Sequence, residues 1–251
     1  MRQVFNFQST SDKLKFTFLT LLGLYLFAGY SLIYSFTKEN NVAHAIISMG
    51  AGLILLWVIL CGLGMHLFRE KIKQVVQSIR LHWQVKFILF CTFLAMLEEA
   101  IATLMTNLAP FFGVQIGQAY ITASTNYFDV ILHHSVIVFI PFFLAWAWIL
   151  NRYNFSPFWA FLLFGVNGIL GESIAFGPQN LIQFAMWIFV YGLMIYLPTY
   201  TLPAGRDAKQ PRFWHGILAF ILPLIFGIVW SIAINLISPN HPSIHFPPIQ
   251  I

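Results

Sequence analysis

Charged residues are scarce in this sequence, and their scarcity excludes most classes of protein. Only 8% of the 251 residues are charged, whereas 59% are hydrophobic and 18% are aromatic. An ordinary soluble domain carries about a quarter charged residues. A soluble fold is therefore excluded. The net charge is +5, but no basic domain exists to hold a polyanion, so we expect no nucleic-acid partner.

Cysteine and the common catalytic signatures are also scarce. The chain has two cysteines, Cys61 and Cys91, and both fall within apolar runs. They do not form an extracellular disulfide framework. The sequence also lacks a P-loop and the HExxH and GxSxG motifs, so no standard hydrolase or nucleotide-binding class is indicated.

Long apolar runs dominate what remains. Each has the length of about 20 residues that a helix needs to cross a hydrocarbon layer. We predict an all-α fold, a polytopic transmembrane helix bundle that forms a single domain over residues 1–251. The first run is too long, and lacks the cleavage site, to be a removable signal peptide. About seven spans are expected, at residues 15–36, 43–66, 86–108, 127–150, 157–176, 180–200 and 213–237.

The basic residues predict the orientation of these spans. Lys and Arg accumulate in short cytoplasmic loops. If the N-terminus is cytoplasmic, all of the 13 basic residues except Lys38 fall on the cytoplasmic side. The C-terminus then lies outside. We expect a multi-pass protein of the inner (plasma) membrane of a prokaryote, in contact with membrane lipid.

Three connecting segments have distinctive compositions. Residues 69–85 predict a basic amphipathic helix on the cytoplasmic surface, or else a plain loop. Residues 108–127 contain no charged residue and are rich in aromatics. This outer loop is therefore expected to fold back and cap the bundle. Residues 238–251 form a Pro-rich outer tail.

Four acidic residues fall within the predicted spans, and these are Glu98, Glu99, Asp129 and Glu172. An ionised side chain at mid-bilayer costs on the order of 3 kcal/mol or more, so such residues face the bundle interior and mark function. No Lys or Arg is predicted deep in the membrane to neutralise them. Their partners must be protons, histidines, water or a metal ion.

Depth along each helix predicts that these groups meet. At about 1.5 Å per residue, Glu99 lies about 13 Å below the outer edge, and His133 and His134 lie about 9 to 11 Å below it. Glu172 and Asn167 lie about 6 and 13 Å below the same edge. All of them therefore fall in the outer half of the membrane, on three consecutive spans.

Helical spacing adds polar neighbours to this predicted site. Residues four apart share one face of a helix, as Asp129 and His133 do. Consecutive residues are about 100° apart, so His133 and His134 are not expected to face one site together. The supporting polar residues are Asn126, Asn167, Thr103 and Asn107.

Such a cluster can do hydrolytic chemistry in two ways. A glutamate beside a histidine can activate water, which makes Glu98, Glu99, His133 and His134 the catalytic candidates. Carboxylates and imidazole can instead hold a divalent metal ion. The predicted metal ligands are Glu99, Asp129, His133 and Glu172.

The adjacent Glu98 and Glu99, followed by a histidine in the next span, resemble the CAAX-prenyl protease type of glutamate-dependent intramembrane peptidase and its bacterial CPBP relatives. Thr103 or Leu104 stands where that family's EExxxR motif has its arginine. The resemblance implies Glu98 or Glu99 as the water activator and His133 or His134 as the first histidine. It implies a hydrophobic or membrane-embedded substrate.

Two other functions remain open. The acids can bind a proton or a cation in a coupled transporter, although neither inverted repeats nor paired helix breaks are evident. The chain can also be a non-catalytic, cofactor-binding subunit with partner subunits. In that case His133 or His134 would bind haem, with His44 as the second ligand at similar depth.

Overall fold

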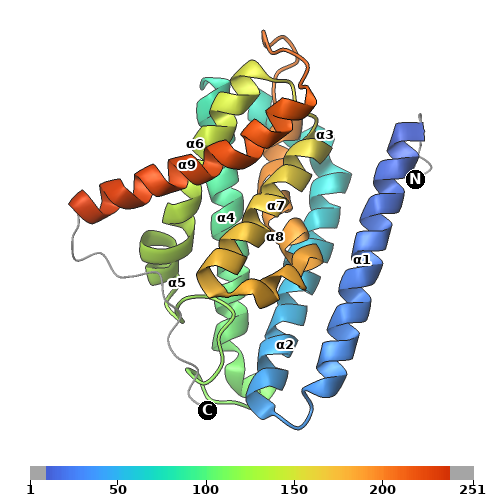
Figure 1. Ribbon diagram of the computed structural model, residues 1–251, viewed down its shortest axis with the longest axis vertical. Helices are drawn as coiled ribbons and strands as arrows, with labels where there is room; N and C mark the ends of the chain where they lie inside the picture. The colour runs from blue at the N-terminus through green and yellow to red at the C-terminus, as the bar shows by residue number, and fades with distance from the viewer. Residues whose placement is uncertain (1–9, 238–251) are drawn as a thin grey trace.

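The computed structural model describes residues 10–237. The predicted tail at 238–251 lies outside the described residues. The described chain is an all-α bundle, as the sequence predicts, and its helices other than α9 run roughly along the long axis of the molecule (Figure 1). The principal helices are α1 (Thr10–Phe36), α2 (Asn41–Leu53), α3 (Gly62–Ser78), α4 (Trp83–Asn107), α6 (Ser135–Arg152), α7 (Pro157–Phe176), α8 (Phe184–Tyr200) and α9 (Phe213–Ile237).

Short irregular helices interrupt or extend these elements. Two of them are π-helices, in which the backbone hydrogen bonds join residues five apart and the turns are wider than in an α-helix. Such turns are frequent at functional sites. The short elements are the π-helices η1 (Ile54–Cys61) and η3 (Val130–His134), the 3-10 helices η2 (Ala109–Phe112) and η4 (Pro178–Leu181), and the single turn α5 (Tyr127–Asp129).

The bundle has the dimensions of a multi-pass membrane protein. Within the described residues, six helices are long and apolar enough to cross a membrane. The exception is α8, whose 17 residues span about 26 Å at 1.5 Å per residue. It follows η4 and is buried along most of its length, and it lies within the sixth predicted span at 180–200.

Small residues bring α7 and α8 into the closest packing of the bundle. A Cβ built at Gly165 would lie 2.7 Å from the Cα of Ile188, so only glycine permits this approach. From the other side, the Trp57 indole donates a hydrogen bond of 3.0 Å to the carbonyl oxygen of Val190. Helix α8 therefore packs on α7 along one side and on η1 along another.

The basic segment at 69–78 is not a separate element. It forms the last turns of α3, which continues α2 and η1 as one helix from Asn41 to Ser78. The sequence from Met65 to Ser78 contains neither proline nor glycine, so nothing stops the helix at the predicted end of the span. A short link at 79–82 then leads into α4.

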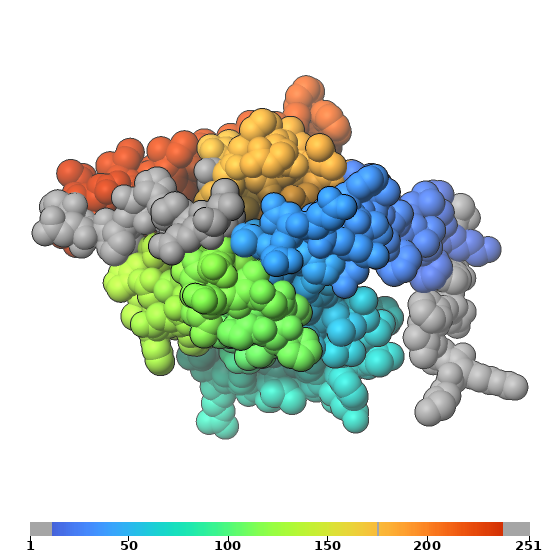
Figure 2. All heavy atoms as spheres, turned by 90° about the horizontal axis from the view of Figure 1, so that it is seen from below, coloured from blue at the N-terminus to red at the C-terminus, as the bar shows by residue number. Residues whose placement is uncertain are grey.

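The connection between α4 and α5 packs onto one end of the bundle, next to the start of α2 (Figure 2). Its Ala109, Val114 and Ala119 are buried against Met49 and Met105. We call this connection, residues 108–126, the cap. The cap matters for the site because its Thr122 contacts Glu99 of α4.

Helices α1 and α9 lie at the periphery. In Figure 1, α9 crosses α6 and α7 obliquely, and α1 stands beside the bundle. Only 11% of the residues in the most apolar stretch of each helix are buried. Their exposed apolar faces are suited to lipid.

Candidate functional site

Three glutamates from two helices converge inside the bundle. Glu98 and Glu99 lie on α4 and are only 5% and 7% exposed. Glu172 lies on α7, near its end, and is close enough to both to interact with them electrostatically. We call Glu98, Glu99 and Glu172 the carboxyl cluster. Helix α4 and helix α7, which is the fifth predicted span, thus both contribute to the carboxyl cluster.

Hydroxyl groups surround the carboxyl cluster. The Tyr191 hydroxyl, from α8, donates a hydrogen bond to Oε1 of Glu172. The Thr122 hydroxyl, from the cap, donates to Oε2 of Glu99 at 2.9 Å. Ser135, the first residue of α6, also forms a side-chain hydrogen bond with Glu99. The site is thus assembled by α4, α6, α7, α8 and the cap.

No basic side chain belongs to the carboxyl cluster within residues 10–237, where the ion pairs are Lys15 with Asp12 and the two histidine contacts of Asp129. A buried charge without a partner is strongly unfavourable. The cluster must therefore take up protons or a small cation to be stable. Its hydroxyl neighbours can either donate or accept a hydrogen bond, so they can serve a carboxylate and a carboxylic acid alike.

A second polar group lies on α5 and η3. Asp129 Oδ1 is 3.1 Å from Nδ1 of His133, and Asp129 Oδ2 is 3.5 Å from Nε2 of His134. We call these three residues the aspartate-histidine group. The expectation that the two histidines cannot face one site is wrong. The π-helix η3 brings residues i and i+5 onto one face, and the backbone at His134 leaves the α-helical region (φ −121°, ψ −84°).

The predicted metal ligands are divided between these two groups. Glu99 and Glu172 belong to the carboxyl cluster, whereas Asp129 and His133 belong to the aspartate-histidine group. The interactions of Asp129 are with Ser124 and the two histidines. Over the described part of the chain, no group of three or more His, Cys, Asp or Glu residues is arranged to hold a metal ion. The four predicted metal ligands are therefore not brought together as one set in the described part of the chain.

The predicted supporting amides on the outer end have structural roles. Asn126 is the N-cap of α5, where its Oδ1 accepts a hydrogen bond of 3.0 Å from the backbone of Phe128. Asn107 donates to the carbonyl oxygens of Thr103 and Thr125, at 3.0 and 2.9 Å. These contacts fix the cap at both of its ends.

Asn167 and Thr103 are buried but do not contact the carboxyl cluster through a recorded hydrogen bond. Asn167 Nδ2 lies 3.5 Å from the carbonyl oxygen of Ala219 and so points toward α9. Its Oδ1, and the Thr103 hydroxyl, have no hydrogen-bond partner among the described residues. The predicted supporting role of Asn167 therefore has no hydrogen bond to the carboxyl cluster behind it.

His44 lies elsewhere in the molecule. Its ring packs on that of Tyr34 with centroids 4.3 Å apart, and its Nδ1 is 3.3 Å from the Thr37 hydroxyl. The residue thus joins α1 to α2, near their connection. This contact gives no support to a haem site shared with His133 or His134.

The sequence interpretation missed Tyr191, Thr122 and Ser135. Each is a hydroxyl residue in or next to an apolar segment, which is a weak signal, because hydroxyl side chains also bond to their own helix backbone. Only the fold shows that they meet the glutamates.

The fold and the carboxyl cluster define a multi-pass membrane protein with a buried acidic centre. No protein family model, curated protein or solved structure matches the chain. Its function must be argued from the site.

Proposed function

We propose that this membrane protein binds and releases protons at the carboxyl cluster, as a proton-coupled carrier does. The observation that carries the proposal is the meeting of Glu98, Glu99 and Glu172 without a basic partner among the described residues. Acidic side chains buried in membrane bundles commonly form proton relays. The hydroxyls of Tyr191 and Thr122 allow protonation to change while hydrogen bonding is kept.

The two π-helices support a role in transport. A π-helix widens one turn and leaves backbone groups less tightly bonded, which makes the helix easier to deform. One π-helix, η3, leads directly into Ser135, which binds Glu99, and the other, η1, packs on α8 through Trp57. The carboxyl cluster is thus linked to helices that can adjust when its charge changes.

Proton binding is tested by infrared difference spectroscopy of the purified chain. Protonated carboxylic acids absorb separately from carboxylates, so a pH step should reveal a buried acid band. Glu98→Gln, Glu99→Gln and Glu172→Gln should each reduce that band. Glu39→Gln is the control, because Glu39 is an exposed residue between α1 and α2. A band unchanged in all three cluster variants would refute proton binding there.

Coupled movement is tested in liposomes that contain a pH-sensitive dye. An imposed membrane potential should drive proton entry through the wild-type chain and through Glu39→Gln. Glu98→Gln should abolish it. Equal entry in the Glu98→Gln variant would show that the cluster does not carry the protons.

Glutamate-dependent hydrolysis is the second candidate. The specific observation is His134, which is buried, has an unpartnered Nδ1 within the described chain, and directly precedes Ser135, a ligand of Glu99. A glutamate and a nearby imidazole can together activate water. The Glu98-Glu99 pair and its following histidine, by which the chain resembles CAAX-type peptidases, favour the same reaction.

Hydrolysis is tested by mass spectrometry of membrane-embedded peptides incubated with the purified chain. Cleavage should be lost in both Glu99→Gln and His134→Gln and retained in Glu39→Gln. Proton entry into liposomes without any peptide cleavage would refute hydrolysis and support the carrier function.

A further inference from the structure

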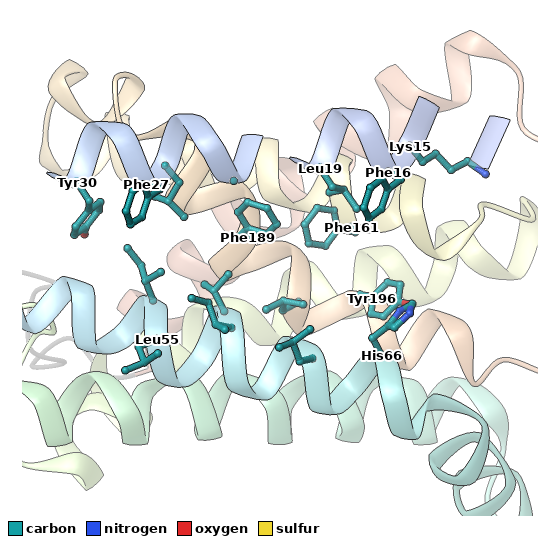
Figure 3. Close-up of a pocket in the computed structure, with 18 of the residues that line it drawn as sticks. Lys15, Phe16, Leu19, Phe27, Tyr30, Leu55, His66, Phe161, Phe189 and Tyr196 are labelled. Carbon is teal, nitrogen blue, oxygen red and sulfur yellow. The ribbon is translucent and has the colours of Figure 1, made fainter. Parts of the chain in front are cut away.

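A large groove separates α1 from the rest of the bundle. Its volume is about 1210 Å³, and its walls are α1 on one side and the continuous helix of α2, η1 and α3 on the other, with α7 and α8 behind (Figure 3). On α1 it extends from Asp12 to Tyr34, which is about 33 Å at 1.5 Å per residue. This length is close to the hydrocarbon thickness of a bilayer, about 30 Å.

The middle of the groove is apolar. Leu, Ile, Val and Phe side chains line it from both walls, and Phe189 lies between them in Figure 3. On α1, Gly23 adds further space, because a Cβ built there would have no atom within 4 Å. The groove can therefore hold a hydrocarbon chain at this level.

The charged residues of the groove gather at one end. Figure 3 shows Lys15 on α1 and His66 on α3 at that end, together with Tyr196 of α8. Asp12 and Arg69 also belong to the lining, and the carboxylate of Asp12 lies 3.3 Å from Nζ of Lys15. The positive-inside pattern predicts that this end is cytoplasmic.

Arg69 has neutral neighbours in place of a carboxylate. It donates to the imidazole of His66, with Nη1 2.8 Å from Nδ1, and its guanidinium lies 5.6 Å from the ring centre of Tyr200. No ion pair to Arg69 exists among the described residues, and Glu70 instead accepts a hydrogen bond from Tyr200. A guanidinium in this setting is suited to bind a phosphate.

We propose that the groove binds a phospholipid with an anionic headgroup. The phosphate would lie at Arg69 and Lys15, and the acyl chains would run along the apolar walls toward Gly23. From Lys15 to Gly23 is about 12 Å along α1, well within the reach of an acyl chain. Basic pockets between transmembrane helices on the cytoplasmic side are known to take such headgroups. The site lies across α8 from Tyr191 and does not depend on the carboxyl cluster.

The proposal is tested by native mass spectrometry of the full-length chain in detergent. Phosphatidylglycerol and phosphatidylcholine with the same acyl chains are titrated separately. We expect the anionic lipid to bind about fivefold more tightly, or better, for each basic residue that contacts it. Arg69→Gln should remove this preference, and Lys15→Gln should weaken it.

A matched pair of variants on α1 tests where the acyl chains lie. Gly23→Phe should fill the groove and prevent binding of both lipids. Gly29→Phe is the control, because a Cβ at Gly29 also meets nothing within 4 Å but Gly29 does not line the groove. Size-exclusion chromatography checks that each variant remains folded. If Arg69→Gln does not remain folded, Lys15→Gln is used in its place to test the preference for the anionic lipid.

Three results would overturn the proposal. The first is equal binding of the two lipids by the wild-type chain. The second is equal lipid occupancy in Gly23→Phe and Gly29→Phe. The third is a dimer that Gly23→Phe dissociates, because a second copy of the chain would then occupy the groove.

Discussion

The hydroxyl of Tyr191 donates a hydrogen bond to Glu172, and this contact joins α8 to α7 at the carboxyl cluster. Tyr191 also lies close enough to Glu98 and Glu99 to interact with both. Its ring stacks on that of Trp187, with centroids 5.7 Å apart, so the hydroxyl is held in place by packing. Tyr191 is therefore the residue of α8 that contacts Glu172 directly and lies near the other two glutamates.

Tyr191→Phe should destabilise the protein by about 1–3 kcal/mol, because it removes the donor to a buried carboxyl and keeps the ring. Thermal unfolding in detergent measures the change. In a double-mutant cycle, Tyr191→Phe should have little further effect in the Glu172→Gln background. Additive effects of the two changes would show that the contact contributes nothing to stability.

The approach of α7 to α8 makes a second prediction. In Gly165→Ala the new methyl group would lie 2.7 and 2.8 Å from backbone atoms of Ile188, which cannot move without displacing α8. We expect a loss of about 1–3 kcal/mol, the usual cost of overpacking. Gly171→Ala on the same helix is the control, since its Cβ would meet no atom within 4 Å. Equal unfolding temperatures for the two variants would contradict the proposed close packing.

The extent of a span could be predicted from the sequence where helix-ending residues bound it, because hydropathy and helix-ending residues are local signals. The helix from Asn41, by contrast, continues past its predicted end to Ser78. Helix α7 begins at Pro157 and ends before Gly177, as predicted. Ser156 caps its start, and Gly177 has a φ of 105°, a backbone conformation that favours glycine. The first and last residues of α7 were therefore predicted correctly from hydropathy and helix-ending residues.

The membership of the site could not be predicted as well, because it depends on how each helix is rotated about its axis. Hydropathy is nearly uniform around α8, so nothing local indicates that Tyr191 faces Glu172. The inserted turn of η3 changes the rotation again and lets His134 join Asp129. The depth of His133, and the helix face that Asp129 shares with it, predicted Asp129 beside the glutamates, whereas its contacts in the structure are with Ser124 and the two histidines.

Arg206 provides a prediction for the loop between α8 and α9. Its guanidinium donates to the carbonyl oxygen of Leu150 at 2.6 Å and to Oδ1 of Asn154 at 2.9 Å. Burial lowers the pKa of this guanidinium, but an arginine side chain is not deprotonated in proteins and so keeps its charge. The charged fork thus fastens the loop to the end of α6.

Arg206→Gln should lower stability by about 2 kcal/mol, since hydrogen bonds to charged groups are worth about 1.5–3 kcal/mol each. Limited proteolysis should cut the loop at 201–212 faster in this variant. Arg212→Gln is the control in the same loop. A loop equally resistant in both variants would show that Arg206 does not hold it.

Thr122 allows the link between the cap and the carboxyl cluster to be tested. Its hydroxyl donates to Glu99, and the cap is otherwise fixed at its ends by Asn107 and by the bond from the Ile121 backbone to the Thr106 hydroxyl. Thr122→Val keeps the shape and removes the donor, so we expect a cost of about 1–3 kcal/mol. Amide hydrogen exchange should rise in the cap, with Thr125→Val as the control. Glu99→Gln changes the acceptor of the same hydrogen bond, so exchange should change at the same amides. Unchanged exchange in Thr122→Val would mean that packing alone closes the cap.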